Sequence, residues 1–170
     1  MMRGKGMPMP ERIVAFPPVA PPDARVLILG SMPSVASLAE GFYYGHPRNA
    51  FWRILADTFG APVPGSIPEK RALLEANGVA LWDVLHSCVR EGSLDSAIRD
   101  MEVNDFAALF ARCPNIGRVL LNGGTAKKVF LKYGARALGS REWVALPSTS
   151  PAYTLSYERK LAQWRQALRS

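Results

Sequence analysis

The sequence predicts an α/β fold, a three-layer α/β/α sandwich around a central, mostly parallel four-stranded sheet. Short runs that are apolar on both faces alternate along the chain with segments of helical periodicity, as in parallel sheets covered by helices. Most of these apolar runs lead into a glycine or a proline, which ends a strand. The chain has 170 residues, 48% of them hydrophobic, and can therefore bury a sizeable core without disulfides or metals.

Four apolar runs predict the strands of the sheet. The first covers residues 25–29 and stops at Gly30, and the others are expected at residues 79–85, 118–121 and 143–146. Ligands of such sheets bind at the carboxyl ends of the strands. A functional site is therefore expected in the loops that follow three of these strands, at residues 30–48, 122–125 and 147–154.

Five helices are predicted between and after the strands. Asn49 is a candidate N-cap for the first, because apolar residues follow it at helical spacing as far as Gly60. The other helices are expected at residues 68–77, 104–112 (capped by Asn104), 125–133 and 157–168. The long stretch before Asn49 is expected to be a loop, and loops of that length inside a compact domain are usually functional.

The chain is expected to form a single domain over residues 23–170, preceded by an extended, proline-punctuated lead-in over residues 1–22. It shows no signal-peptide pattern and no apolar run of transmembrane length, so we expect a cytoplasmic protein that does not enter membranes. Cys88 and Cys113 stand alone, and the chain has only two histidines. This composition predicts no metal site and no cofactor.

The charge balance is consistent with a polyanionic partner. Lysine and arginine number 21 against 14 acidic residues, which gives a formal net charge of +7. A basic surface attracts nucleic acid because phosphate contacts release condensed counterions. The alternative is that the charge serves solubility alone. The basic residues are spread along the chain, so they do not locate a binding surface.

Two strand-end loops carry motifs. The first reads GSMPSVASLAEGFYYGHPRNAFW over residues 30–52, and the second reads LPSTSPAY over residues 146–153. In this order and combination they resemble the two motifs of the uracil-DNA glycosylase superfamily. The block GHPRNAFW is similar to the mismatch-specific branch, and the GS-x-P and S-T-S-P patterns are most similar to the hypoxanthine-DNA glycosylases, called family six.

The resemblance implies a monofunctional DNA glycosylase that flips a deaminated base, uracil or hypoxanthine, out of DNA and hydrolyses its bond to deoxyribose, initiating base-excision repair. The implied partner is double- or single-stranded DNA containing such a base, and the implied state is a monomer. The implied residues are Asn49 and Ser31 in catalysis; Gly30, Met32, Tyr44, His46 and Ser148 in base binding; and Ser150, Pro151, Ala152 and Tyr153 in a loop that enters the duplex.

The sequence departs from the superfamily pattern at two positions. Met32 stands where many members carry the Asn or Asp that positions water, and its thioether cannot perform that task. Ser148 stands where several branches carry His or Asn. The resemblance to family six implies that Asn49 takes over. A backbone turn at Gly30 and Ser31 can in addition offer N–H groups to a base carbonyl.

Each assignment has a structural alternative. Asn49 is equally explained as a helix cap, and Tyr44 as packing of the loop onto the core. His46 and Ser148 suit ordinary loop positions. Asp83, within an apolar strand, either faces the pocket or pairs with a buried partner. The sequence NGGT at residues 122–125 fits a tight strand-to-helix turn better than a phosphate loop.

Two other functions remain open at this stage. A DNA-binding module that has lost hydrolysis would explain Met32. A hydrolase of free nucleosides would explain an α/β pocket, but it would explain neither the basic charge nor the loop of residues 150–153.

Overall fold

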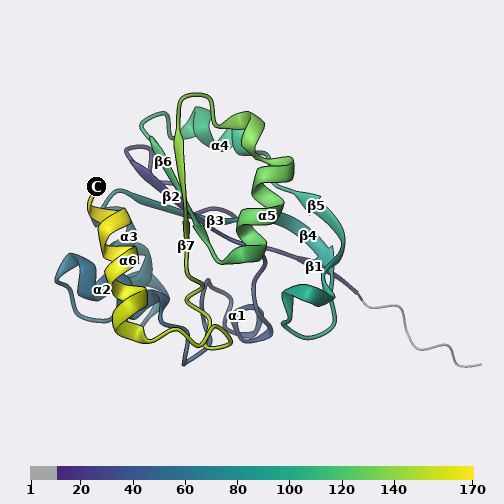
Figure 1. The fold of residues 1–170 in the computed structure, drawn as a ribbon, viewed down its shortest axis with the longest axis horizontal. Helices are drawn as coiled ribbons and strands as arrows, with labels where there is room; N and C mark the ends of the chain where they lie inside the picture. The colour runs from purple at the N-terminus through teal and green to yellow at the C-terminus, as the bar shows by residue number, and fades with distance from the viewer. Residues whose placement is uncertain (1–10) are drawn as a thin grey trace, which may run out of the picture.

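The computed structural model of the protein describes residues 11–170, and its centre is a four-stranded sheet (Figure 1). The strands are β2 (Val26–Gly30), β3 (Val79–Asp83), β6 (Arg118–Asn122) and β7 (Glu142–Leu146). They lie in the order β3-β2-β6-β7, and every neighbouring pair is parallel. The predicted α/β class with a central parallel sheet is confirmed.

The strand order reverses beside β2. The chain passes from β2 to its neighbour β3 and then returns to β6 on the other side of β2. Connections leaving neighbouring strands in opposite directions open a crevice at their carboxyl ends, and ligands bind there in open α/β sheets. The ends of β2 and β6, at Gly30 and Asn122, face this crevice.

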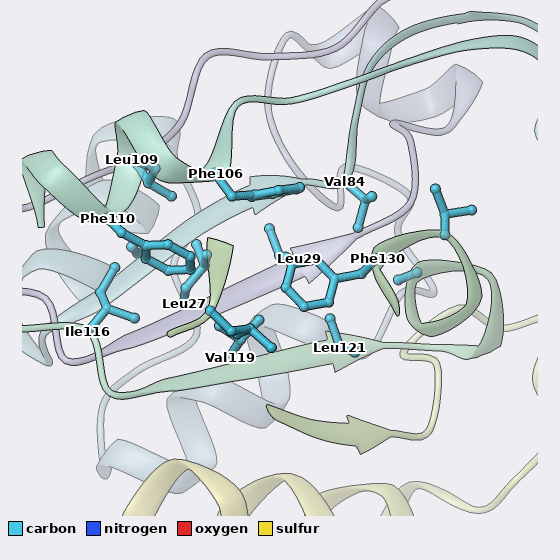
Figure 2. Close-up of a cluster of buried hydrophobic side chains, with 14 of the residues drawn as sticks. Leu27, Leu29, Val84, Phe106, Leu109, Phe110, Ile116, Val119, Leu121 and Phe130 are labelled. Carbon is cyan, nitrogen blue, oxygen red and sulfur yellow. The ribbon is translucent and has the colours of Figure 1, made fainter. Parts of the chain in front are cut away.

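Alternating residues of the strands feed two separate cores. Leu27 and Leu29 of β2 point to one side, where they pack with α4 (Phe106–Arg112), α5 (Gly124–Tyr133) and β6 (Figure 2). Ile28 points to the opposite side, which is covered by α2 (Phe51–Phe59), α3 (Ile67–Ala76) and α6 (Tyr157–Arg169) (Figure 1). Apolar residues on both faces of each strand therefore produce the three layers.

Polar side chains cap the first turns of several helices, and these helices begin close to the predicted residues. Ser66 caps α3 and Ser156 caps α6 through their hydroxyl groups. The predicted Asn104 cap of α4 is wrong: Asp105 is the cap, and its side chain accepts a hydrogen bond from Ala108 N at 3.1 Å. Asn104 instead donates to the backbone oxygen of Asp83 at 2.7 Å.

A second, antiparallel sheet was not predicted. It contains β1 (Arg12–Val14), β4 (Leu85–Val89) and β5 (Arg99–Val103), in the order β1-β4-β5. The expected single strand at residues 79–85 is wrong because β3 ends at Asp83 and Leu85 already belongs to β4. Val84 and Leu85 are both fully buried, so hydrophobicity does not change where the chain leaves one sheet for the other.

The lead-in and the first loop are more structured than the sequence indicates. Residues 11–22 include β1 and a bridge between Val19 and Leu81, whereas residues 1–10 lie outside the described part. The expected continuous loop over residues 31–48 is wrong, because it contains α1 (Val35–Glu40), capped by Ser34. This helix is only six residues long, too short for apolar periodicity to reveal it.

No helix within residues 11–170 is both long and apolar enough to cross a membrane. In the same part of the chain, His, Cys, Asp and Glu form no cluster of three or more that could hold a metal ion.

Candidate active site at the switch point of the sheet

A cavity of about 470 Å³ opens at the carboxyl ends of the strands, where the strand order reverses. Every residue that the sequence singled out for catalysis, base binding or duplex entry lines it. These residues are Gly30, Ser31, Met32, Tyr44, His46, Asn49, Ser148, Ser150, Pro151, Ala152 and Tyr153. The fold thus joins two motifs that lie about a hundred residues apart in the sequence; the role of each residue remains a prediction.

Gly30 is the last residue of β2 and lines the cavity. A Cβ atom at this position would lie 2.7 Å from Asp83 Oδ1 and 2.8 Å from Tyr44 Oη. Both distances are too short for a carbon atom, so only glycine leaves room for the carboxyl and the phenol together. The glycine of the first motif therefore allows two polar groups to converge beside β2.

Asp83 is the most unusual group of the cavity. Its side chain is buried, and its Oδ2 has no hydrogen-bond partner within residues 11–170. Burial raises the pKa of Asp83 to about 7, with a further increase from Asp95 and an opposing effect of Arg90. A buried polar atom without a hydrogen-bond partner lowers the stability of the fold. The free Oδ2 of Asp83 is therefore available to bind a ligand.

Tyr44 forms a wall of the cavity. Its backbone is left-handed, with φ of 54°, which is uncommon for a residue other than glycine. The ring stacks on Phe51 with centroids 4.1 Å apart, and burial raises the pKa of the Tyr44 hydroxyl far above its ordinary value. Tyr43 instead enters the core and donates to the backbone oxygen of Pro17 at 2.8 Å. Both tyrosines line the cavity, but Tyr43 is buried and Tyr44 only half-buried, so Tyr44 has more accessible surface.

Asn49 lines the cavity two residues before α2 begins at Phe51. Its Oδ1 accepts a hydrogen bond from Phe51 N at 2.9 Å, so the amide caps the helix although the N-cap position itself is Ala50. This bond fixes one end of the side chain, and the Nδ2 group keeps two donors. His46 is held in a similar way, since its Nδ1 accepts from Arg48 N at 3.1 Å.

The serines of the two motifs have partners of their own. Ser31 donates to Asp95 Oδ1 at 3.0 Å, which ties the end of β2 to the segment after β4. Ser148 Oγ accepts from Ser150 N at 3.2 Å and so stabilises its own turn. Met32 is buried in the core and contributes an apolar surface to the cavity.

The second motif is tied firmly to the sheet. Thr149 N donates to Asn122 Oδ1 and Asn122 Nδ2 donates to Thr149 Oγ1, both at 3.0 Å, and Ala50 N donates to Thr149 O. Lys160 of α6 holds the next residue by donating to Ser150 O at 3.0 Å. Beyond these anchors Pro151, Ala152 and Tyr153 are exposed. The loop thus has a fixed base and a protruding tip.

Sequence reasoning missed several residues that line the cavity. Asn122 and Thr149 lie in loops where a functional site was expected, but neither was given a role, and the structure shows that they join β6 to the second motif. Residues 93–96, between β4 and β5, also line the cavity, and Val35 N donates to Ser93 Oγ at 2.9 Å. Their sequence is an ordinary polar turn, and nothing in it indicates that it reaches the end of β2.

Comparison with known proteins agrees with this geometry. The uracil DNA glycosylase superfamily matches the chain over residues 17–169. Two proteins named hypoxanthine DNA glycosylase, from Methanosarcina barkeri and Methanosarcina acetivorans, are each 36% identical over 155 residues, which is 91% of this chain and 96% of each relative. A solution NMR structure of a candidate uracil DNA glycosylase from Methanosarcina acetivorans aligns with a TM-score of 0.81 at 34% identity, covering 94% of this chain and 98% of that one. The chain therefore belongs to the uracil DNA glycosylase superfamily.

Proposed function

We propose that this protein is a monofunctional DNA glycosylase that excises a deaminated base, hypoxanthine or uracil, from DNA. Membership of the superfamily and the two hypoxanthine DNA glycosylase relatives support the general activity, hydrolysis of N-glycosyl bonds in DNA. The choice of base and the hydrolytic mechanism rest on the cavity, in which both motifs and the unpartnered carboxyl of Asp83 meet beside Gly30.

Asp83 suits recognition of a deaminated base. Deamination replaces an amino group by a carbonyl and places a proton on the neighbouring ring nitrogen. Above its pKa of about 7, an ionised Asp83 can accept that N–H, whereas adenine and cytosine present an unprotonated nitrogen that a carboxylate repels. The wall of Tyr44 offers the base an aromatic surface for stacking. Together these groups favour the deaminated base over its parent.

Asn49 is the proposed residue that orients the attacking water. Its Oδ1 is fixed by Phe51 N, so the amide has a defined position at the cavity edge. Hydrolysis of the glycosidic bond makes the sugar positive and the leaving base negative, and oriented hydrogen bonds stabilise that separation. An amide is a poor general base, so the mechanism depends on a good leaving group more than on removal of a proton.

The cavity also favours hydrolysis over attack by an amine. Among the described residues that line it there is no lysine whose amine could bond to the sugar carbon. Lys160 lines the neighbouring groove and donates to Ser150 O. Water is therefore the proposed nucleophile, and the product is an abasic site with an intact strand.

A panel of labelled duplexes tests this proposal. Each carries one hypoxanthine, uracil, xanthine or adenine, and is analysed on denaturing gels before and after alkali. We expect strand breaks after alkali for at least one deaminated base, no breaks before alkali, and an uncut adenine duplex. Breaks before alkali would reject the monofunctional mechanism. Retarded but uncut duplexes would support a binding module, and release of base from free inosine alone would support a nucleoside hydrolase.

A further inference from the structure

The segment that connects β4 to β5, residues 90–98, belongs to the second sheet but reaches the cavity beside Gly30. Two hydrogen bonds join it to the first motif. Ser31 Oγ donates to Asp95 Oδ1 at 3.0 Å, and Val35 N donates to Ser93 Oγ at 2.9 Å. Ser93 and Asp95 also line the cavity. A part of the chain outside the central sheet therefore forms one wall of the candidate active site.

Arg90 fastens the start of this segment to the first motif. Its side chain is 4% exposed, its Nη2 donates to the backbone oxygen of Pro33, and its Nε donates to that of Gly92 at 2.7 Å. Its Nη1 is buried and has no hydrogen-bond partner within residues 11–170. In the same part of the chain no carboxylate forms an ion pair with Arg90. A buried guanidinium without a counter-charge lowers the stability of the fold.

The two hydrogen bonds to backbone oxygens do not explain why this residue is charged. A neutral donor could hold Pro33 and Gly92 without the cost of burying a positive charge. Arg90 lies outside the cavity lining, and the described residues that form the lining include no lysine or arginine. Its charge therefore lies behind the wall of a cavity whose carboxyl groups are Asp83 and Asp95. In a buried site of low dielectric, a charge acts on a carboxyl that it does not touch.

Few other charges face Asp83. The titratable side chains that share the cavity with it are Tyr43, Tyr44 and His46 from the first motif, Asp95 from the β4–β5 segment, and Tyr153 from the second motif. Burial raises the pKa of Tyr43 and of Tyr44 far above the ordinary value, so both phenols stay neutral. Burial is also the largest cause of the raised pKa of Asp83; the charge of Asp95 raises it further, and the charge of Arg90 lowers it.

We propose that Arg90 and Asp95 are positioning residues that control the charge of Asp83 in opposite directions. Arg90 stabilises the ionised carboxylate, and Asp95 stabilises the protonated acid. The β4–β5 segment is then a specificity-determining element, because only the ionised Asp83 accepts the ring N–H of a deaminated base, whereas the protonated acid offers a donor to the bare ring nitrogen of adenine. This consequence rests on the proposed function, but the control of the Asp83 charge does not.

Titration of Asp83 itself tests this inference without requiring catalysis. The ¹³Cγ chemical shift of Asp83, identified by its loss in Asp83→Asn, is followed in the full chain without DNA from about pH 4 to about pH 9. Asp95→Asn should lower the pKa of Asp83 by about one unit, and Arg90→Met should raise it by a similar amount. Asparagine keeps an oxygen for Ser31, so Asp95→Asn removes the charge and leaves the contact. Arg90→Lys restores the positive charge and should return the pKa toward the wild-type value.

Asp23→Asn is the matched control, because Asp23 is exposed and precedes β2 at the opposite end of the sheet. It should leave the pKa of Asp83 unchanged. An unchanged pKa in Asp95→Asn or in a folded Arg90→Met, shifts of both in the same direction, or a shift in Asp23→Asn equal to that in Asp95→Asn would overturn the proposal. If Arg90→Met does not fold, the exposed Asp95→Asn decides alone.

The same variants, assayed on a duplex with one hypoxanthine, connect the charge of Asp83 to excision. The pH dependence of single-turnover excision should move in the same direction as the pKa of Asp83, to lower pH in Asp95→Asn and to higher pH in Arg90→Met. Because His46 also lines the cavity, the titration of Asp83 and not the rate decides which group is responsible. Shifted pKa values in a protein that excises no base would keep the control of Asp83 and reject the enzymatic function.

Discussion

At the scale of single residues, the cavity contains groups that a purely structural role does not explain. Asp83 is buried with an unpartnered Oδ2, and Tyr44 adopts a left-handed backbone although it is not glycine. Both features cost free energy and both lie beside Gly30, where the two side chains converge. Strain and unsatisfied polar groups of this kind are typical of sites that bind a ligand.

The first prediction concerns Asp83 and stability. Its pKa is about 7 in the folded protein and 3.8 in a solvated reference, so between these values the folded state holds a proton that the unfolded chain has lost. The free energy of unfolding therefore falls as pH rises from about 4 to about 7. Asp83→Asn removes this fall and should be more stable than the wild type near neutral pH.

Urea unfolding at about pH 5 and about pH 8 measures this effect. Each pKa unit is worth about 1.4 kcal/mol, so the advantage of the variant should grow by a few kcal/mol between the two conditions. Asp83→Asn should also lose its preference for a deaminated base. An advantage that is the same at both pH values would show that the Asp83 carboxyl is not protonated in the fold.

A second prediction separates the two roles of Asn49. Asn49→Ala should slow single-turnover excision by about 10²–10³, because an oriented hydrogen-bonding group is lost, while affinity for DNA stays. Removing the bond to Phe51 N also costs about 1 kcal/mol of stability. Asn49→Asp is the control, since aspartate caps as well as asparagine and should keep part of the activity. A folded Asn49→Ala variant with the wild-type rate would leave Asn49 with its capping role alone.

At the scale of elements, the loop after β7 combines a rigid base with an exposed tip. Trp164 Nε1 donates to Pro147 O at 2.9 Å, and Asn122 and Lys160 hold the following residues. Tyr153 closes a turn by donating from its backbone N to Ser150 O at 3.1 Å, and its side chain is 45% exposed. A loop that is pre-organised in this way would lose little entropy on binding.

The third prediction tests that entry. Unstacking a base costs a few kcal/mol, and we propose that Tyr153 occupies the space that the flipped nucleotide leaves. Tyr153→Ala should therefore slow excision from duplex DNA much more than from single-stranded DNA. Tyr133→Ala is the matched control, because Tyr133 is 49% exposed at the end of α5. Equal losses on both substrates would exclude a wedge role for Tyr153.

At the scale of the whole molecule, the central sheet could be predicted because its strands are apolar on both faces and alternate with helices. The two motifs could be placed together because parallel strands bring their carboxyl ends to one edge. The second sheet could not be predicted, because Val84 and Leu85 continue the hydrophobic run of β3 without a break. The importance of Asp83 remained open because its unpartnered oxygen depends on neighbours far away in the sequence.

The amino-acid composition likewise does not reveal how the charges are distributed in the folded molecule. The net charge of +7 indicates a polyanionic partner only in general terms. Folding places Asp83 and Asp95 at the cavity beside Gly30, and it places four cations and the carboxylate of Glu40 at a neighbouring cavity, although these residues are spread along the chain. The folded structure therefore separates charges that the composition only counts.

A crystal structure of the protein bound to DNA would locate the flipped base. The duplex should carry a 2′-fluorinated deoxyinosine, whose glycosidic bond resists hydrolysis and holds the complex before cleavage. We predict that the base lies in the cavity beside Gly30, stacked against Tyr44, with its ring N–H within hydrogen-bond distance of Asp83. A base that remains in the helix, or that binds outside this cavity, would contradict this assignment.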